Sequence, residues 1–150
     1  MIKNVLIILL TILVFSCNTD DDTKIVSIQS ILISKDNLYG NGGEGINKQN
    51  IVITDDGVWN DLITQMNTIN NVSDNFSETE IDFSEYTVIA VFDEIKGNGG
   101  HSLELNITSN PENIMVNITD LAPNGNATTV ITQPYHIVKI KKTVLPIVFE

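Results

Sequence analysis

Apolar residues recur with a helical period in one segment of the chain, residues 57–69. They fall at i, i+3, i+4, i+7 and i+10, namely Trp59, Leu62, Ile63, Met66 and Ile69. This spacing places them on one stripe of an α-helix. Thr54 or Asp55 can cap the N-terminus of this helix, where acidic groups also suit the dipole. Because a helix this short is marginal alone, we expect its stripe to pack on a sheet, with Trp59 in the core.

Elsewhere the period is two or the apolar run is continuous, which predicts strands. We expect strands at 24–34, 50–54, 86–92, 101–107, 114–119, 129–141 and 146–149. Residues 86–92 are apolar at nearly every position, which is typical of a central strand covered on both faces. Proline has no backbone N–H, so Pro134 should lie at a bulge or a sheet edge. Consecutive strands with short connections predict an α+β fold, an antiparallel β-sheet with one amphipathic helix packed on a face.

Two glycine-rich segments interrupt this pattern. The glycines of residues 39–47 miss the spacing of a dinucleotide-binding motif, and no helix follows directly, so we expect a loop. Gly97-Asn98-Gly99-Gly100 lies between two predicted strands. A phosphate-binding loop would lead into a helix N-terminus, whereas an alternating strand follows here. We therefore predict a hairpin turn, for which glycine and asparagine supply positive φ angles.

The N-terminus has the parts of a bacterial export signal. Lys3 precedes an apolar run from Val5 to Phe15, which is too short to span a bilayer, since about 20 residues are needed. The sequence Val14-Phe-Ser-Cys17 resembles a lipobox, in which the cysteine is acylated after cleavage before it. We expect residues 1–16 to be a lipoprotein signal peptide and Cys17 to be the lipidated residue, with palmitate among its acyl chains. The alternatives are a secreted protein with a free cysteine and a short membrane anchor.

Residues 17–23 are polar and acidic and predict a solvated tether before one domain at 24–150. Cys17-Asn-Thr-Asp-Asp-Asp22 resembles the export signal of surface lipoproteins in the Bacteroidota. That resemblance implies a lipid-anchored protein of the outer membrane, exposed on the cell surface. The periplasmic leaflet is the alternative location. Replacing Asp20, Asp21 and Asp22 by alanine should then retain the protein inside the envelope.

Composition excludes some functions. The chain has 150 residues, a formal net charge of −11 and no arginine, and loss of residues 1–16 removes only Lys3, leaving −12. An acidic surface without guanidinium groups matches phosphate backbones poorly, so nucleic-acid binding is not expected. The histidines, His101 and His136, are far apart in the sequence, and zinc needs three or four ligands, so neither a metal site nor a cofactor is expected. A Ser–His pair that is adjacent only in space stays open.

Two longer segments resemble the C-terminal domain of the PrcB family of protease-complex subunits. They are IDFSEYTVIAVFDEIKGNGGHSLELNI, Ile81 to Ile107, and TQPYHIVKI, Thr132 to Ile140. A strand that leads into a helix with a tryptophan near its start, as at Trp59, fits the same order. The resemblance covers roughly 51–149, and its most specific pieces are Asn98-Gly-Gly-His101 and Gln133-Pro-Tyr135. The family's turn usually ends in tyrosine, where His101 stands here.

The resemblance implies a small lipoprotein, not an enzyme, that binds and stabilises a protein partner, in the type case a surface protease. Its candidate binding surface comprises the 97–101 turn, the 122–126 loop and residues 133–136; the candidate contact residues are Asn98, Gly99, Gly100, His101, Gln133, Tyr135 and His136. Two alternatives stay open. One is a surface protease inhibitor that presents the 97–101 glycine turn, and the other is a glycan-binding or small-ligand-binding module.

Overall fold

The computed structural model describes residues 24–125 and 127–150, which form two four-stranded sheets and one α-helix. The elements are β1 (Val26–Ser27), β2 (Ile31–Leu38), β3 (Gln49–Ile53), α1 (Asp56–Met66), the 3-10 turn η1 (Val72–Asn75), β4 (Tyr86–Phe92), β5 (Ser102–Ser109), β6 (Ile114–Leu121), β7 (Gln133–Lys141) and β8 (Ile147–Phe149). The predicted α+β class with one helix is confirmed. None of the helices in the described residues has the length and apolar character needed to span a bilayer.

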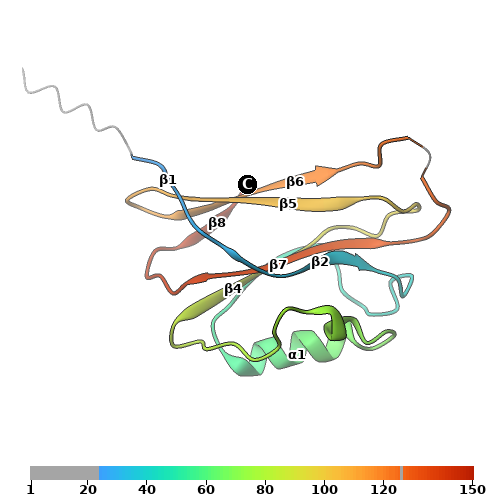
Figure 1. Cartoon of the computed structure of the whole chain (residues 1–150), viewed down its shortest axis with the longest axis horizontal. Coiled ribbons are helices and arrows are strands. Elements are labelled where there is room, and N and C mark those ends of the chain that lie inside the picture. The colour runs from blue at the N-terminus through green and yellow to red at the C-terminus, as the bar shows by residue number, and fades with distance from the viewer. Residues whose placement is uncertain (1–23, 126) are drawn as a thin grey trace, which may run out of the picture.

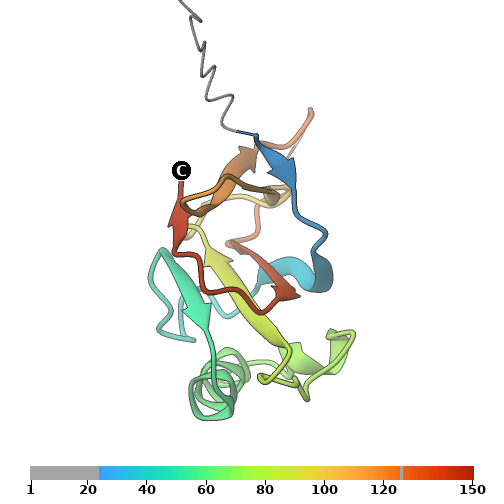
Figure 2. The same cartoon turned by 90° about the vertical axis from the view of Figure 1, so that its left-hand side faces the viewer.

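The molecule has three layers (Figure 1). The helix-covered sheet has the order β2-β7-β4-β3, and the second sheet has the order β1-β5-β6-β8. All pairs are antiparallel except β6 with β8. Helix α1 packs on the face of the helix-covered sheet that points away from the second sheet (Figures 1 and 2).

Two cores lie between these layers. The helix-side core comprises Ile33, Leu38, Ile46, Ile53, Trp59, Leu62, Met66, Ile81, Phe83, Val88, Ala90, Phe92, Tyr135 and Ile137. The inter-sheet core comprises Ile89, Val91, Leu103, Ile107, Ile114, Val116, Val138 and Ile140. Successive residues of a strand face opposite sides. The predicted central strand β4 therefore supplies Val88 and Ala90 to one core and Ile89 and Val91 to the other, as its apolar run indicated.

The helix is close to its prediction. Asp55 is the N-cap, and its carboxylate accepts a hydrogen bond from the Val58 N–H at 3.0 Å. Trp59, Leu62 and Met66 are buried, as the stripe predicted. The helix ends at Met66, so Ile69 lies beyond it and is 52% exposed, and the prediction of a helix through residue 69 was wrong.

Three predictions about strand connections were also wrong. Residues 24–34 form not one strand but β1 and the start of β2, which belong to different sheets. Residues 97–100 do not close a hairpin, because β4 and β5 lie in different sheets and the glycine segment crosses between them. Pro134 lies in β7, an interior strand, and pairs with Asn37 with no bulge at that point.

The side chain of Gln133 explains how the interior strand β7 tolerates Pro134. The Asp93 N–H donates to the Pro134 carbonyl at 3.0 Å, so the two residues form a hydrogen-bonded pair. Because proline has no N–H, it cannot donate the second bond of this pair to the Asp93 carbonyl. Gln133 Nε2 donates to the Asp93 carbonyl instead, at 2.8 Å, and to the Ile46 carbonyl at 2.9 Å. A side-chain amide thus replaces the missing ladder bond.

Candidate functional site

One end of the molecule gathers the long connections. Strands β2, β4 and β6 end there and β3, β5 and β7 begin there, which brings together residues 39–48, 93–101, 122–125 and 127–132 (right in Figure 1). We call this the loop end. The described chain begins at the opposite end, before β1 (left in Figure 1). Loops positioned by a rigid scaffold are where binding residues concentrate.

The structure brings together two of the three segments that the sequence singled out. The Gly99 N–H donates to the Thr128 carbonyl at 3.0 Å, and a Cβ built on Gly100 would lie 2.8 Å from Pro123 Cβ. Gly100 also has a φ of 88°, which a larger residue would adopt only with strain. The 97–101 segment therefore forms one surface with residues 122–125 and 127–128, and glycine is required at their contact.

His101 and Asn98 lie within this surface and are partly buried. His101 Nε2 is 3.2 Å from Asn98 Oδ1, and the Asn98 carbonyl accepts a hydrogen bond from Thr132 Oγ1 at 3.1 Å. These bonds link the glycine segment to the start of β7. Asn98, Gly99, Gly100 and His101 therefore lie at the loop end, and their contact with a partner stays a prediction.

Gln133, Tyr135 and His136 are not part of that surface. They are 2%, 1% and 7% exposed, because both faces of β7 are covered. The Tyr135 hydroxyl is 3.0 Å from Ser34 Oγ, and burial raises the pKa of Tyr135 to about 12. His136 Nδ1 lies 2.9 Å from the Leu103 carbonyl and so donates to it across the inter-sheet core. The prediction that these three side chains contact a partner was wrong, since they are packed inside the protein.

A cluster of charges anchors the glycine segment. The Asp93 carboxylate, only 3% exposed, has Lys48 Nζ at 2.7 Å on one oxygen and Lys96 Nζ at 2.7 Å on the other. Lys96 Nζ also lies 3.0 Å from Asp120 Oδ2 and 3.2 Å from Glu94 Oε1. The cluster joins the 39–48 loop, the 93–101 segment and the end of β6.

The charges on Asp93 and Lys96 are fixed at neutral pH. Burial alone would raise the pKa of Asp93, but the hydrogen bonds from Lys48 and Lys96 outweigh it and lower this pKa to about 2. Burial likewise opposes the charge on Lys96, but bonds to Asp93, Asp120 and Glu94 raise its pKa well above the usual range. A catalytic acid or base works best with a pKa near the operating pH. Asp93 and Lys96 are therefore suited to holding structure rather than to moving protons.

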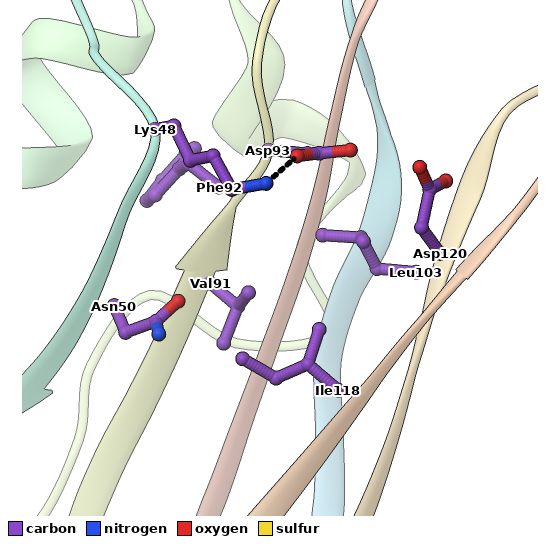
Figure 3. A pocket seen from close by; sticks show the side chains of 8 residues that line it. All are labelled: Lys48, Asn50, Val91, Phe92, Asp93, Leu103, Ile118 and Asp120. Carbon is purple, nitrogen blue, oxygen red and sulfur yellow. Dashed lines mark ion pairs between the residues drawn. The ribbon is translucent and has the colours of Figure 1, made fainter. Parts of the chain in front are cut away.

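A pocket of about 220 Å³ opens beside this cluster (Figure 3). Its polar side is formed by Lys48, Asn50, Asp93 and Asp120, and its apolar side by Val91, Phe92, Leu103 and Ile118. Pockets for drug-sized ligands occupy roughly 300–1,000 Å³. This pocket therefore has room for one or two side chains of a partner rather than for an extended ligand.

Sequence reasoning missed most of this cluster. The spacing of Asp93 and Lys96 was a visible signal, whereas Lys48 and Asp120 reach the site only through the fold. Within residues 24–125 and 127–150, no three His, Cys, Asp or Glu side chains are grouped to hold a metal ion. Cys17, the signal peptide 1–16 and the tether 17–23 lie outside the described residues.

Comparison of the chain with family models, with curated proteins and with solved structures finds no match. The fold and the site thus define the class of the protein only as an α+β domain of two sheets and one helix with a loop-rich end. Similarity to the PrcB family stays a prediction from the residues quoted above.

Proposed function

We propose that the protein is a lipid-anchored, non-catalytic accessory protein of the outer membrane that binds a partner protein through its loop end. The proposed partner is a cell-envelope protease, which the protein stabilises. The lipobox-like Val14–Cys17 and the acidic residues after it support the anchor and a position on the cell surface. The resemblance to the PrcB family supports the class of partner.

Exposed apolar side chains at the loop end carry this proposal. They are Tyr39, Ile69, Ile95, Leu121, Val130 and Ile131, and each is at least 38% exposed. Two of them contact glycines of the loop end, since a Cβ on Gly42 would lie 2.6 Å from Ile95 Cδ1 and one on Gly99 would lie 2.9 Å from Val130 Cγ1. Exposed apolar side chains at one end of a molecule favour an interaction site there.

Two further features suit this surface to binding. The loop end lies opposite the start of β1 (Figure 1), so an anchor attached before residue 24 leaves it facing away from the membrane. The Asp93 cluster and the Gly99–Thr128 hydrogen bond fix the loops before any partner arrives. Preorganised loops lose less conformational entropy on binding, which favours affinity.

The proposal is tested by affinity capture of the full-length, membrane-anchored protein from crosslinked cells. Ile95→Glu and Val130→Glu each place a charge in the apolar surface, and Val58→Glu is the matched control. Val58 is 46% exposed on α1, away from the loop end. We expect the parent and the Val58 variant to recover the same protease, and the two loop-end variants to lose it at least tenfold. Equal recovery by all four proteins would contradict the proposal.

The same preparation separates a stabiliser from an inhibitor. A stabiliser lengthens the lifetime of the captured protease without lowering its turnover, whereas an inhibitor lowers turnover. The structure favours the stabiliser, because Gly99 is buried and hydrogen-bonded to the neighbouring loop. An inhibitory loop must enter an active-site cleft, which this arrangement opposes.

A further inference from the structure

The two edges of the helix-covered sheet differ in how their backbone groups are used. An exposed edge strand presents N–H and C=O groups that can pair with another chain, and native proteins usually protect such edges. Strand β2 is protected. The Ser77 N–H and hydroxyl donate to the Ile33 and Leu32 carbonyls, both at 2.9 Å, and the Asp36 carboxylate accepts from the Asn37 N–H at 2.8 Å. The pairing register of β2 also shifts between Leu32 and Ser34.

Strand β3 has none of these protections. It pairs with β4 without a register shift and contains no proline and no charged residue. The Asp93 backbone bonds to β7. In an antiparallel sheet, every second residue of β4 therefore directs its backbone groups to β7, and the residues between them direct theirs to β3. Gln49, Ile51 and Ile53 therefore use their backbone groups toward β4, and Asn50 and Val52 direct theirs outward. Within the described residues, no hydrogen bond reaches the backbone groups of Asn50, Val52 or Thr54 from outside the sheet.

The edge is also accessible in space. Figure 2 shows β3 at the margin of its sheet, with α1 below it and β8 above. The side chains of Asn50 and Val52 point toward the second sheet, and Val52 is 38% exposed. The other two edges of the sandwich, β1 and β8, have only two and three residues. Short edge strands of this kind pair poorly, which leaves β3 as the edge best able to accept another strand.

We propose that β3 pairs antiparallel with β3 of a second copy of this chain, centred on Val52, so that the two helix-covered sheets become one continuous sheet. This register places Val52 opposite Val52 and Asn50 opposite Thr54. It also brings Lys48, which precedes β3, near Asp56 of the other copy, the first residue of α1. All outward-directed backbone groups then face each other. Nearby opposite charges attract and like charges repel, so these two residues at the ends of β3 favour this register over a shift by two residues.

The charges at the two ends of β3 are therefore complementary between two copies, which favours a second copy of this chain as the occupant of the edge. A heterologous strand would need its own complementary charges, whereas two copies related by a twofold axis supply both pairs at once. The proposal rests on the β3 edge rather than on the loop end, with which it shares only Lys48.

Disulfide trapping tests the pairing in full-length protein in its native membrane. Directly opposed residues in a hydrogen-bonded antiparallel pair have Cα atoms about 5.5 Å apart, within the usual range for a disulfide. Val52→Cys should therefore give a covalent dimer under mild oxidation. Lys35→Cys is the matched control, since it lies on the protected edge β2 with its side chain also toward the second sheet. The parent chain, with Cys17 alone, gives the background. Equal crosslinking from positions 52 and 35, with both thiols reactive toward maleimide, would overturn the proposal.

Charge exchange tests the register. Lys48→Glu and Asp56→Lys each place like charges opposite one another in the dimer. Added to the Val52→Cys protein, each should slow its crosslinking several-fold. Combining both charge changes restores the pair between copies, though not the contact of Lys48 with Asp93, and should recover the rate of Val52→Cys alone. Failure of this combined variant to recover, with its fold intact by circular dichroism, would contradict this register.

A second variant measures assembly without a thiol. The Val52 N–H points away from β4, so Val52→Pro removes a bond between copies and none within the sheet. We expect the parent to be a dimer in detergent by light scattering and Val52→Pro to be a monomer with a similar unfolding temperature. A monomeric parent that also fails to crosslink would refute the proposal.

Discussion

The two cores of the molecule are built from different residues. The helix-side core contains Trp59, Phe83, Phe92 and Tyr135, and polar atoms of two of them have fixed partners. The buried apolar side chains of the inter-sheet core are all isoleucine, valine or leucine. Aromatic side chains with a polar atom fix a particular geometry, whereas aliphatic ones mainly fill volume. The helix-side core therefore specifies the fold in detail, and the inter-sheet core contributes burial.

The inter-sheet core is also less completely closed. Pockets open along the β3 side of the sandwich, one lined by Val91, Leu103 and Ile118 and another by Val52, Leu145 and Ile147. Cavity formation costs most where the surroundings cannot relax. Equivalent truncations in the two cores should thus have unequal effects.

Truncating Trp59 should have the largest effect. Its ring lies 6.0 Å from that of Phe76, centroid to centroid, and its Nε1 donates to the Thr79 carbonyl at 2.7 Å. Trp59→Ala should lower the free energy of unfolding by about 3–5 kcal/mol. Val58→Ala on the exposed side of the same helix should change it by less than about 0.5 kcal/mol. Urea denaturation compares the two, and similar losses would show that α1 is not essential to the core.

Within the inter-sheet core, Ile89 and Leu103 provide a matched pair. Ile89 lies in the interior strand β4 and is fully buried, whereas Leu103 borders the pocket beside Asp93. We expect Ile89→Ala to fall toward the upper part of the roughly 2–5 kcal/mol range for such truncations, and Leu103→Ala toward its lower part. Water can enter from the pocket beside Leu103, so no dry cavity forms there. A larger loss for Leu103→Ala in the same denaturation assay would reverse this ranking.

The elements that build the two cores could be predicted from the sequence, but the division into two sheets could not. The helical stripe with Trp59 and the continuous apolar run of β4 are local patterns, and both were interpreted correctly except for the end of the helix. The division into two sheets left no local signal. A glycine segment between two strands has the same composition whether the second strand returns beside the first or crosses to another sheet, as Gly97–Gly100 does.

The candidate site was predictable only in part for the same reason. The glycines of residues 98–101 marked this segment as a candidate binding site, and it lies at the loop end. Lys48 and Asp120 come from distant parts of the chain, and only the fold places them around Asp93 and Lys96. The rule that proline marks a sheet edge failed because the Gln133 side chain supplies the hydrogen bond that Pro134 lacks.

Asp93 provides the next smaller effect, which depends on pH. Its pKa of about 2 lies below the ordinary value of 3.8, so the folded state binds its proton less readily than the unfolded state does. This contributes about 2 kcal/mol of stability at neutral pH, which is lost as the pH falls from about 4 toward 2. Asp93→Asn should be destabilised by that amount at pH 7 and should approach the parent near pH 2. A constant difference across this range would show that the ion pairs with Lys48 and Lys96 do not stabilise the fold.

The smallest expected effect on stability comes from His136, whose side chain lies in the inter-sheet core. Burial lowers the pKa of His136, although the hydrogen bond to the Leu103 carbonyl opposes this. The unfolded state therefore takes up a proton near the ordinary pKa of about 6.5 while the folded state still resists it, so stability falls as the pH drops below that value. His136→Phe keeps a planar ring but cannot be protonated, and its free energy of unfolding should change less than that of the parent between pH 7 and pH 5.

Tyr135→Phe, on the other face of the same strand, is the control. It should lose about 1 kcal/mol of stability with the hydroxyl bond to Ser34, yet keep the parent's pH dependence. Parallel pH profiles for the parent and His136→Phe would show that the inter-sheet core accommodates the charged imidazole, and would remove His136 as a cause of acid sensitivity.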